Sequence, residues 1–542
     1  MISSLINYFN ETEPADSNEN QETIINHMGA ENHIPNSLTN LRLLVNCWFL
    51  GEPTYYKKGT VKTKLSKELY LVPDFHGETT MDIFKNVVNK ALEEDFEGVL
   101  KLASQSRNEF MMRSGPCAIL YYAVMHTQRA AFNAEHPLLF RQYAKEIIKI
   151  PTDAWQLFEL YTKEHSDGKN SKQKLPTILK KVLSDHLESL EAYQMKKYLN
   201  KCHLVDLIRI SHASSKVNPL IENVVNKTLT VEDDAQTWET LRSQGKTWPE
   251  ILEQIKIPHM ALLRNLVGIS KEVEDLTNII DKLKKGVKHG KQFPYRYLSA
   301  YEEVSKLDKP LLLQGIAECV ELAMEAFPIL EGNVVCLSDN SGSAWGAFPS
   351  QYGKQTVAKI GNLSSIMTAK RCTGKGYVGV FGNRLTMLEI DKDKTVLEQQ
   401  VTVDAAGKNV GAATENGIWI FFKEAFEEFE KTKDVSKMSK FANHICIYSD
   451  MQCGHGGLYG NSSEYPEFQM PDHKYIDVLK LINKYRELIN PKVNVYCVQI
   501  SAYNNTLIPE HLYRTHIMSG WSGNEIVYMD KMNKLMNEMD QL

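Results

Sequence analysis

Val334-Val335-Cys336-Leu337-Ser338-Asp339-Asn340-Ser341-Gly342-Ser343 is an apolar run that ends abruptly in Asp-x-Ser-x-Ser. An apolar run without polar alternation is typical of a buried parallel strand. In an open α/β sheet, ligands bind beyond the carboxyl ends of the strands, where Asp339, Ser341 and Ser343 would lie. One carboxylate and two hydroxyls are hard oxygen donors, suited to Mg²⁺ or Mn²⁺ rather than to zinc. A serine-rich turn that caps the next helix is the alternative.

The chain after this stretch alternates between strand and helix patterns. Short apolar runs predict strands at 377–381, 444–448 and 493–500. Apolar residues at helical spacing predict helices at 355–368, 416–429, 475–488 and 524–542. Such alternation indicates a doubly wound α/β domain built on a parallel sheet.

Two further polar residues fall where a cation site at the strand ends would need them. Asp450 follows the predicted strand at 444–448, and Thr414 precedes the predicted helix at 416–429. With Asp339, Ser341 and Ser343, they resemble the metal-ion-dependent adhesion site of von Willebrand factor A domains. That resemblance implies that the five residues hold a divalent cation, Mg²⁺ or alternatively Mn²⁺, which keeps an open position for a partner's carboxylate.

Alternatives stay open for the two outer residues of this set. Thr414 could be a helix N-cap, and Asp450 a solvated loop carboxylate. Von Willebrand factor A domains usually carry Thr-Asp at the third motif, where this chain has Thr414-Glu415. The outer part of the predicted site therefore departs from the family pattern.

The chain from about residue 41 to residue 310 shows helical periodicity and almost no strand pattern. Paired apolar stripes recur without a strict sequence repeat, for example at 84–92 and 96–103. Helix pairs of degenerate sequence predict an α-solenoid of HEAT type, which presents a long curved surface. A helical bundle of no special kind is the alternative.

Four segments of this helical region carry a family resemblance. They are Cys47–Tyr56, His203–His212, Met260–Leu266 and Phe293–Ala300. In this order, and followed by the adhesion-site motif, they resemble the TROVE module of the Ro autoantigen and its bacterial orthologues. The resemblance implies a ring of HEAT repeats at 37–325 and a von Willebrand factor A-like α/β domain at 326–542. The residues before them are rich in Asn, Glu and Ser, which predicts a flexible N-terminal arm at 1–36, either a loosely ordered tail or a docking arm.

The same resemblance implies a function. Members of the family bind misfolded non-coding RNA ends in the hole of the ring and small stem-loop Y RNAs on its outer face, and they are not enzymes. We therefore expect a monomeric, cytoplasmic ribonucleoprotein component with these RNA partners and an exoribonuclease as a protein partner. No membrane association is expected, because the sequence has no apolar run of 18 or more residues. Nine cysteines without a CxxC pair indicate a reducing compartment and no structural zinc.

The formal net charge of −5 is not typical of a nucleic-acid-binding protein. An RNA-binding surface would therefore have to be a local cluster of basic residues. The basic residues predicted to contact RNA are Lys196, Lys197, Lys201, Arg209, His212, Lys284, Lys285 and Lys288. His212 matches the family histidine at its RNA surface. For the lysines the alternative is a solvated helix face, for Arg209 a buried structural pairing, and for His212 a helix C-cap.

Two hypotheses from different classes follow from these observations. The first is an RNA-binding scaffold, which the ordered motifs and basic runs favour. The second is a metal-dependent protein-interaction module without RNA binding, which the acidic overall balance favours. An enzyme is a distant third, because the sequence shows neither a paired general acid and base nor a nucleophile constellation.

Overall fold

The computed structural model describes residues 22–25, 31–47, 78–165, 175–230, 237–290, 292–346, 355–412, 415–450, 477–500, 506–520 and 522–541. These form two compact units. The helical unit comprises Ser37–Asn46 and Asp82–Lys256. The mixed unit comprises the described residues within 1–36, 47–81 and 257–542.

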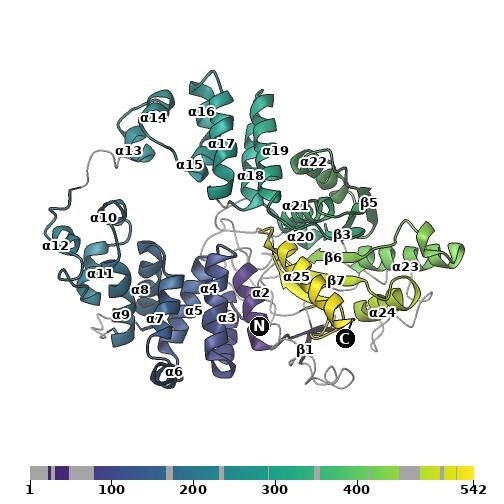
Figure 1. Cartoon of the computed structure of the whole chain (residues 1–542), viewed down its shortest axis with the longest axis horizontal. Coiled ribbons are helices and arrows are strands. Elements are labelled where there is room, and N and C mark those ends of the chain that lie inside the picture. Colours follow the sequence, from purple (N-terminus) through teal and green to yellow (C-terminus); the bar gives the residue numbers. More distant parts are fainter. Residues whose placement is uncertain are drawn as a thin grey trace. The chain divides into compact units, whose positions relative to one another are not determined.

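The helical unit consists of consecutive helices that pack against one another in pairs (Figure 1). They are α2 (Ser37–Cys47), α3 (Thr80–Glu94), α4 (Phe96–Asn108), α5 (Ser114–Met125), α6 (Arg129–Glu135), α7 (Leu139–Ile147), α8 (Pro151–His165), α9 (Thr177–Glu188), α10 (Ala192–Tyr198), α11 (Leu204–Ser211), α12 (Leu220–Val225), α13 (Trp238–Ser243) and α14 (Trp248–Gln254). Helix α4 contacts α5 and α7, and α5 contacts α8. This pairing agrees with the predicted HEAT-like architecture.

The sequence explains why these helices pack as they do. In α7 the buried residues Phe140, Tyr143, Ala144 and Ile147 recur at helical spacing, so one face of the helix meets its neighbours. Helix α5 is buried along its whole length from Gly115 to Val124, which accounts for its almost entirely apolar sequence.

The mixed unit begins with five helices that lie before the sheet. They are α15 (His259–Arg264), α16 (Leu266–Glu272), α17 (Thr277–Gly290), α18 (Pro294–Val304) and α19 (Pro310–Met324). Helix α19 packs on α17 and α18 and also on α22 (Val396–Gly407). The helices predicted to belong with the upstream repeats therefore group with the α/β part. The proposed boundary at residue 325 stays a prediction.

A six-stranded sheet in the order β5-β4-β3-β6-β7-β8 forms the centre of the mixed unit. Its strands are β3 (Val334–Asp339), β4 (Gly376–Phe381), β5 (Leu385–Glu389), β6 (His444–Ser449), β7 (Asn494–Gln499) and β8 (Thr515–Ser519). All neighbouring pairs are parallel except β4 and β5. The predicted parallel sheet therefore carries one antiparallel strand at its edge.

The two faces of the central strand meet different helices. The remaining helices are α20 (Gly342–Gly346), α21 (Val357–Lys370), α23 (Glu415–Thr432), the 3₁₀ helix η4 (Val435–Lys437), α24 (Val478–Leu488) and α25 (Asn524–Met539). Val335 and Leu337 join the apolar core made with α23 and α24. Ser338 points to the other face, where its hydroxyl donates to Asn362 of α21 over 2.7 Å. Side chains of a strand alternate between faces, so this helix-sheet-helix layering follows from the strand itself.

An N-terminal hairpin belongs to the mixed unit. Strand β1 (Thr23–Ile25) pairs antiparallel with β2 (Glu31–His33). The backbone of His33 then exchanges hydrogen bonds of 3.0 and 2.8 Å with that of Thr506. The arm predicted at 1–36 thus contains a segment docked by backbone pairing.

Eight of the nine cysteines fall within the described residues, and all eight are buried free thiols. The ninth, Cys453, lies outside the described residues. Among the helices that are described, none combines the length and apolarity needed to cross a membrane.

Candidate functional site

The predicted cation-binding residues that the structure describes, Asp339, Ser341, Ser343 and Asp450, lie at the carboxyl edge of the sheet. From β3 the chain moves first to β4 on one side and later to β6 on the other, so the strand order reverses at β3. Asp339 ends β3, and Asp450 follows β6 directly. Because β3 and β6 are parallel neighbours, both carboxyl groups lie at the switch point, where open α/β sheets bind their ligands.

Hydrogen bonds hold the loop after β3 in a defined shape. The Ser341 backbone N–H donates to Asp339 Oδ1 over 2.9 Å, and the Ser449 hydroxyl donates to Asp339 Oδ2 over 2.7 Å. The Ser341 and Ser343 hydroxyl oxygens lie 2.9 Å apart. The predicted convergence of Asp339, Ser341 and Ser343 is therefore present in the structure.

Burial makes the Asp339 carboxyl group costly to ionise. Asp339 and Asp450 are both fully buried. Burial raises the pKa of the Asp339 carboxyl, while hydrogen bonds from Ser341 and Ser449 oppose the rise. A divalent cation would offset the charge of buried carboxylates, and the neighbouring oxygens are hard donors. The residues present therefore fit a Mg²⁺-like ion.

The third predicted motif lies partly outside the described residues. Thr414 is not described, but the segment just before it contacts the loop. The Gly342 backbone N–H donates to the Ala412 carbonyl over 3.1 Å. A Cβ on Gly342 would lie 3.3 Å from the Ala412 Cβ, so glycine permits this close approach. Within the described parts of the chain there is no group of three or more His, Cys, Asp or Glu residues able to hold a metal.

The first basic surface lies in the helical unit and is called here the α10–α11 surface. It consists of the exposed residues Lys196, Lys197, Lys201, Arg209 and His212. The first two lie on α10, Lys201 lies in the following turn, and Arg209 lies on α11. The alternative of a buried pairing for Arg209 is wrong, because its side chain is exposed.

His212 is the C-cap of α11, which the sequence left as the alternative to a role in RNA contact. Its φ of 59° places it in the left-handed region at the C-cap of α11, and its backbone N–H donates to the Ile208 carbonyl. Its ring nevertheless stays exposed, and Nε2 lies 3.3 Å from Nζ of Lys180 on α9. The cap conformation therefore presents the imidazole beside the Lys180 ammonium.

Two aromatic rings lie near Lys197 of this surface. The Lys197 Nζ is 5.7 Å from the ring centroid of Tyr193 and 5.8 Å from that of Tyr198. Tyr193 is 41% exposed. Lysines interleaved with accessible tyrosines can neutralise phosphates and offer a face for base stacking.

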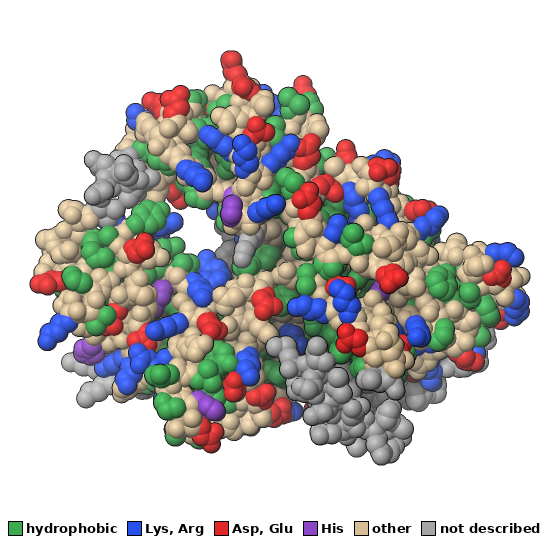
Figure 2. Space-filling view, viewed as in Figure 1, with side chains coloured by type: hydrophobic (Ala, Val, Ile, Leu, Met, Phe, Trp, Pro, Cys, Tyr) green, Lys and Arg blue, Asp and Glu red, His purple; other side chains and the backbone are tan. Residues whose placement is uncertain are grey.

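The second basic surface lies on α17 in the mixed unit. Lys285 and Lys288 are exposed, whereas Lys284 is half-buried and forms an ion pair with Glu318 of α19. Lys284 therefore has an internal partner, which weakens its predicted role as an RNA contact. Lys282, which belongs to the same basic run of the sequence, is exposed on this helix. Figure 2 shows Lys and Arg side chains gathered over the region of α16 to α18.

Sequence reasoning missed the polar side chains beneath the cation loop. Asn340, Asn362 and Asp404 form a hydrogen-bonded chain, described below, that joins β3 to α21 and α22. Asn340 lies inside the Asp339–Ser343 motif, so its position in the sequence was a signal that could have identified it. Asp404 lies on a helix that was not predicted.

Comparison with known proteins shows what parts of this chain are similar to. The family model described as the TROVE domain matches residues 227–358. This part of the chain is therefore similar to the TROVE domain. The crystal structure of the Ro (RSR) protein of Deinococcus radiodurans aligns with 92% of this chain and 100% of that chain, with a TM-score of 0.53 and 12% identity. The predicted fold class, a helical HEAT-like region followed by a von Willebrand factor A-like domain, is confirmed.

The curated proteins that match part of this chain are much larger proteins. Telomerase protein component 1 of Mus musculus is 37% identical over 87 residues, which are 14% of this chain and 3% of that protein. Its Rattus norvegicus counterpart is 28% identical over 153 residues, which are 26% of this chain and 6% of that protein. The chain thus matches only a small part of the length of these relatives.

Proposed function

We propose that this TROVE-domain chain is an RNA-binding scaffold of a ribonucleoprotein. It binds small non-coding, Y-like RNA and the single-stranded 3′ ends of misfolded structured RNA, and it serves RNA quality control. The observation that carries the proposal is the α10–α11 surface, where Lys196, Lys197, Lys201 and His212 are exposed and the Lys197 ammonium lies near the rings of Tyr193 and Tyr198. The proposal includes a cytoplasmic monomer, without enzymatic activity of its own, that works with an exoribonuclease.

Electrostatics explains how an acidic chain can bind RNA. The net charge is −5, yet the α10–α11 surface concentrates cations locally. Each phosphate that a lysine neutralises releases counterions, so affinity falls as salt rises. Binding should therefore be strongly salt-dependent and weakly dependent on sequence.

Charge reversal tests the surface directly. Lys196→Glu, Lys197→Glu and Lys201→Glu together should weaken binding of a stem-loop RNA, measured by fluorescence anisotropy at several salt concentrations. The salt slope should become shallower by roughly 0.7–0.9 for each phosphate that is no longer neutralised. The matched control reverses three exposed lysines of the α/β part, Lys480, Lys531 and Lys534. An unchanged slope in the first triple variant would remove the α10–α11 surface from the RNA interface.

His212 separates the two kinds of RNA ligand. His212→Ala should reduce stem-loop binding and spare binding of a duplex with a single-stranded 3′ end. His203→Ala is the matched control, because His203 is also exposed and left-handed and flanks the same helix. Equal loss of both ligands would mean one shared surface. No binding of either ligand by the unsubstituted protein at low salt would contradict the RNA proposal.

A second candidate function is a metal-dependent protein-interaction module without RNA binding. The convergence of Asp339, Ser341, Ser343 and Asp450 at the switch point favours it. We propose that these residues hold Mg²⁺ or Mn²⁺, with Thr414 as a further ligand. A bound cation would supply a Lewis-acidic position for a partner's carboxylate.

Calorimetric titration with Mn²⁺ tests the cation site. Asp339→Ala should abolish Mn²⁺ binding, because it removes the only ligand of the loop that carries a full charge. The sheet should stay folded. Asp393→Ala, at an exposed position in the same unit, is the control. Unchanged Mn²⁺ affinity in Asp339→Ala would show that the ligand assignment is wrong.

A further inference from the structure

A pair of buried amides lies directly beneath the cation loop. The Asn340 Nδ2 donates to the Ser338 carbonyl over 3.0 Å and to Asn362 Oδ1 over 2.8 Å. The Asn362 Nδ2 donates back to Asn340 Oδ1 over 3.0 Å. Both side chains are at most 1% exposed. Since Asn340 stands between the proposed ligands Asp339 and Ser341, its anchoring fixes the backbone that carries them.

Asp404 on α22 sets the orientation of the Asn340 and Asn362 side-chain amides. Its Oδ1 accepts from Asn362 Nδ2 over 2.8 Å and from Gln400 Nε2 over 2.7 Å. A carboxylate can only accept, so Asn362 must turn its amide nitrogen toward Asp404. The Asn362 oxygen is then left to accept from Ser338 and Asn340. One acceptor on α22 thus decides the orientation of both amides.

The backbone of α22 is adapted to this contact. A Cβ on Gly407 would lie 2.0 Å from Asn340 Oδ1. Glycine at this position lets the helix approach the loop, although glycine near the end of a helix lowers helix propensity. The close approach and the polar chain point to the same partner, Asn340.

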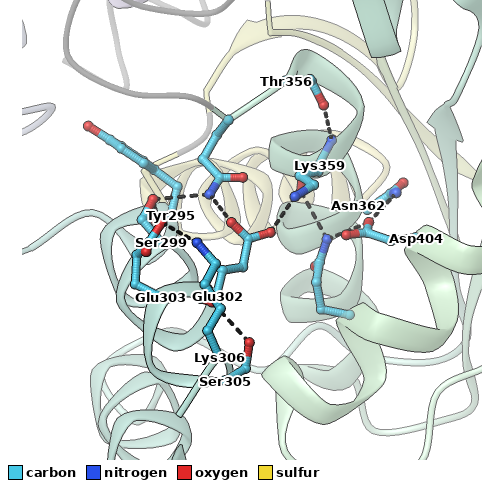
Figure 3. Close-up of polar contacts among 12 residues, drawn as sticks. Tyr295, Ser299, Glu302, Glu303, Ser305, Lys306, Thr356, Lys359, Asn362 and Asp404 are labelled. Carbon is cyan, nitrogen blue, oxygen red and sulfur yellow. Dashed lines mark hydrogen bonds and ion pairs between the residues drawn. The ribbon is translucent and has the colours of Figure 1, made fainter. Parts of the chain in front are cut away.

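The chain of contacts continues outward to α18 (Figure 3). The Gln400 Nε2 also donates to the Lys359 carbonyl over 3.1 Å, and the Lys359 ammonium pairs with Glu302. Gln355 donates to the same Glu302 over 2.7 Å. The charged groups that influence Asp404 are therefore Lys359 on α21 and Glu302 on α18.

We propose that Asp404 is a positioning residue for the cation site, which orients Asn340 through Asn362 and so holds Asp339 and Ser341 in place. This inference rests on the cation site proposed above. Residues that orient the ligands of a metal without touching it commonly change metal affinity when they are replaced.

The test uses the full chain and three variants. Asp404→Ala removes the acceptor and frees both amides to rotate, so Mn²⁺ affinity should fall about tenfold to a hundredfold. Asp404→Asn keeps an acceptor oxygen and should restore affinity close to that of the unsubstituted protein. Asp393→Ala removes an exposed carboxylate just before the same helix and should change nothing.

Hydrogen–deuterium exchange in metal-free protein supplies a second readout. Peptide 338–346 should exchange faster in Asp404→Ala than in Asp404→Asn or the control. Unchanged affinity and unchanged exchange in Asp404→Ala would overturn the proposal. Equal losses in Asp404→Ala and Asp404→Asn would also overturn it, because Asp404→Asn keeps the acceptor oxygen and the loss would then follow from the missing negative charge. If the unsubstituted protein binds no Mn²⁺, the cation site is wrong, and exchange still decides whether Asp404 orders the loop.

Discussion

At the scale of single residues, Asp404 makes stability depend on pH. Burial raises the pKa of its carboxyl from 3.8 to about 6, while Asn362, Lys359 and Gln400 oppose the rise. The folded state therefore keeps a proton that the unfolded chain releases, so stability is lost as pH rises from about 4 to 6. The rise in pKa corresponds to at most about 3 kcal/mol.

Asp404→Asn should remove this contribution. Its melting temperature relative to that of the unsubstituted protein should be higher at pH 7 than at pH 4.5, measured by differential scanning calorimetry. Comparing the two proteins at each pH cancels the titration of other groups. If the difference in melting temperature between the two proteins is the same at both pH values, the raised pKa of Asp404 is wrong.

The residues at strand ends were predictable, but those that support them were not. Asp339 and Ser341 were identified because an apolar strand stops abruptly before them. Asn362 could not be identified, since a lone amide in an otherwise apolar helical stripe gives no sign of its partner. Its role depends on Asp404, 42 residues later in the sequence, and only the fold brings the two together.

At the scale of elements, the packing of α15 on α17 depends on two glycines. A Cβ on Gly286 or Gly290 would lie 2.5 or 2.3 Å from the ring of His259, which also contacts the Tyr297 hydroxyl through Nε2 at 2.8 Å. On an isolated helix, replacing glycine with alanine would stabilise by about 1 kcal/mol. Here the clash should outweigh that gain.

Gly286→Ala should therefore destabilise the protein by roughly 1–3 kcal/mol, as overpacking commonly does. Chemical denaturation followed by circular dichroism would measure it. Lys285→Ala, on the exposed face of the same helix, is the matched control and should change stability little. A stabilised Gly286→Ala variant would show that α15 and α17 do not pack closely around His259.

Elements with a clear hydrophobic pattern were predicted from the sequence, and elements with a weak or interrupted pattern were missed. The strands β3, β4, β6 and β7 are apolar runs and were found within one or two residues. Helix α22 was missed because buried Gln399 and Gln400 interrupt its apolar stripe. Its N-terminal capping box, Thr395 with Glu398, was the available signal. Strand β5 was missed because it is a short, half-buried edge strand.

At the scale of the whole molecule, the helices before the sheet contribute to the stability of the α/β part. The Lys370 ammonium pairs with Glu321 of α19 over 2.7 Å, and the Val396 N–H donates to the same carboxylate over 2.8 Å. Leu312, Ile316 and Val320 of α19 are buried. Sequence periodicity could not show this grouping, because these helices look like those upstream.

A fragment of residues 257–542 should therefore melt at a higher temperature than a fragment of residues 326–542. Losing even about 2 kcal/mol of packing would lower the melting temperature by about 4–8 °C in a domain of this size. Differential scanning calorimetry of the two fragments would measure it. Equal melting temperatures would show that α15–α19 add nothing to the α/β part.

Because its described thiols are buried, the protein is suited to distance measurements by fluorescence energy transfer between dyes on newly introduced cysteines. With Cys453→Ser, every remaining cysteine is a buried one, which a maleimide dye reaches slowly. New cysteines at exposed Lys101 on α4 and Lys480 on α24 would then carry a donor and an acceptor fluorophore, one in each compact unit. Energy transfer between the dyes would report whether adding RNA or a divalent cation moves the two units with respect to each other.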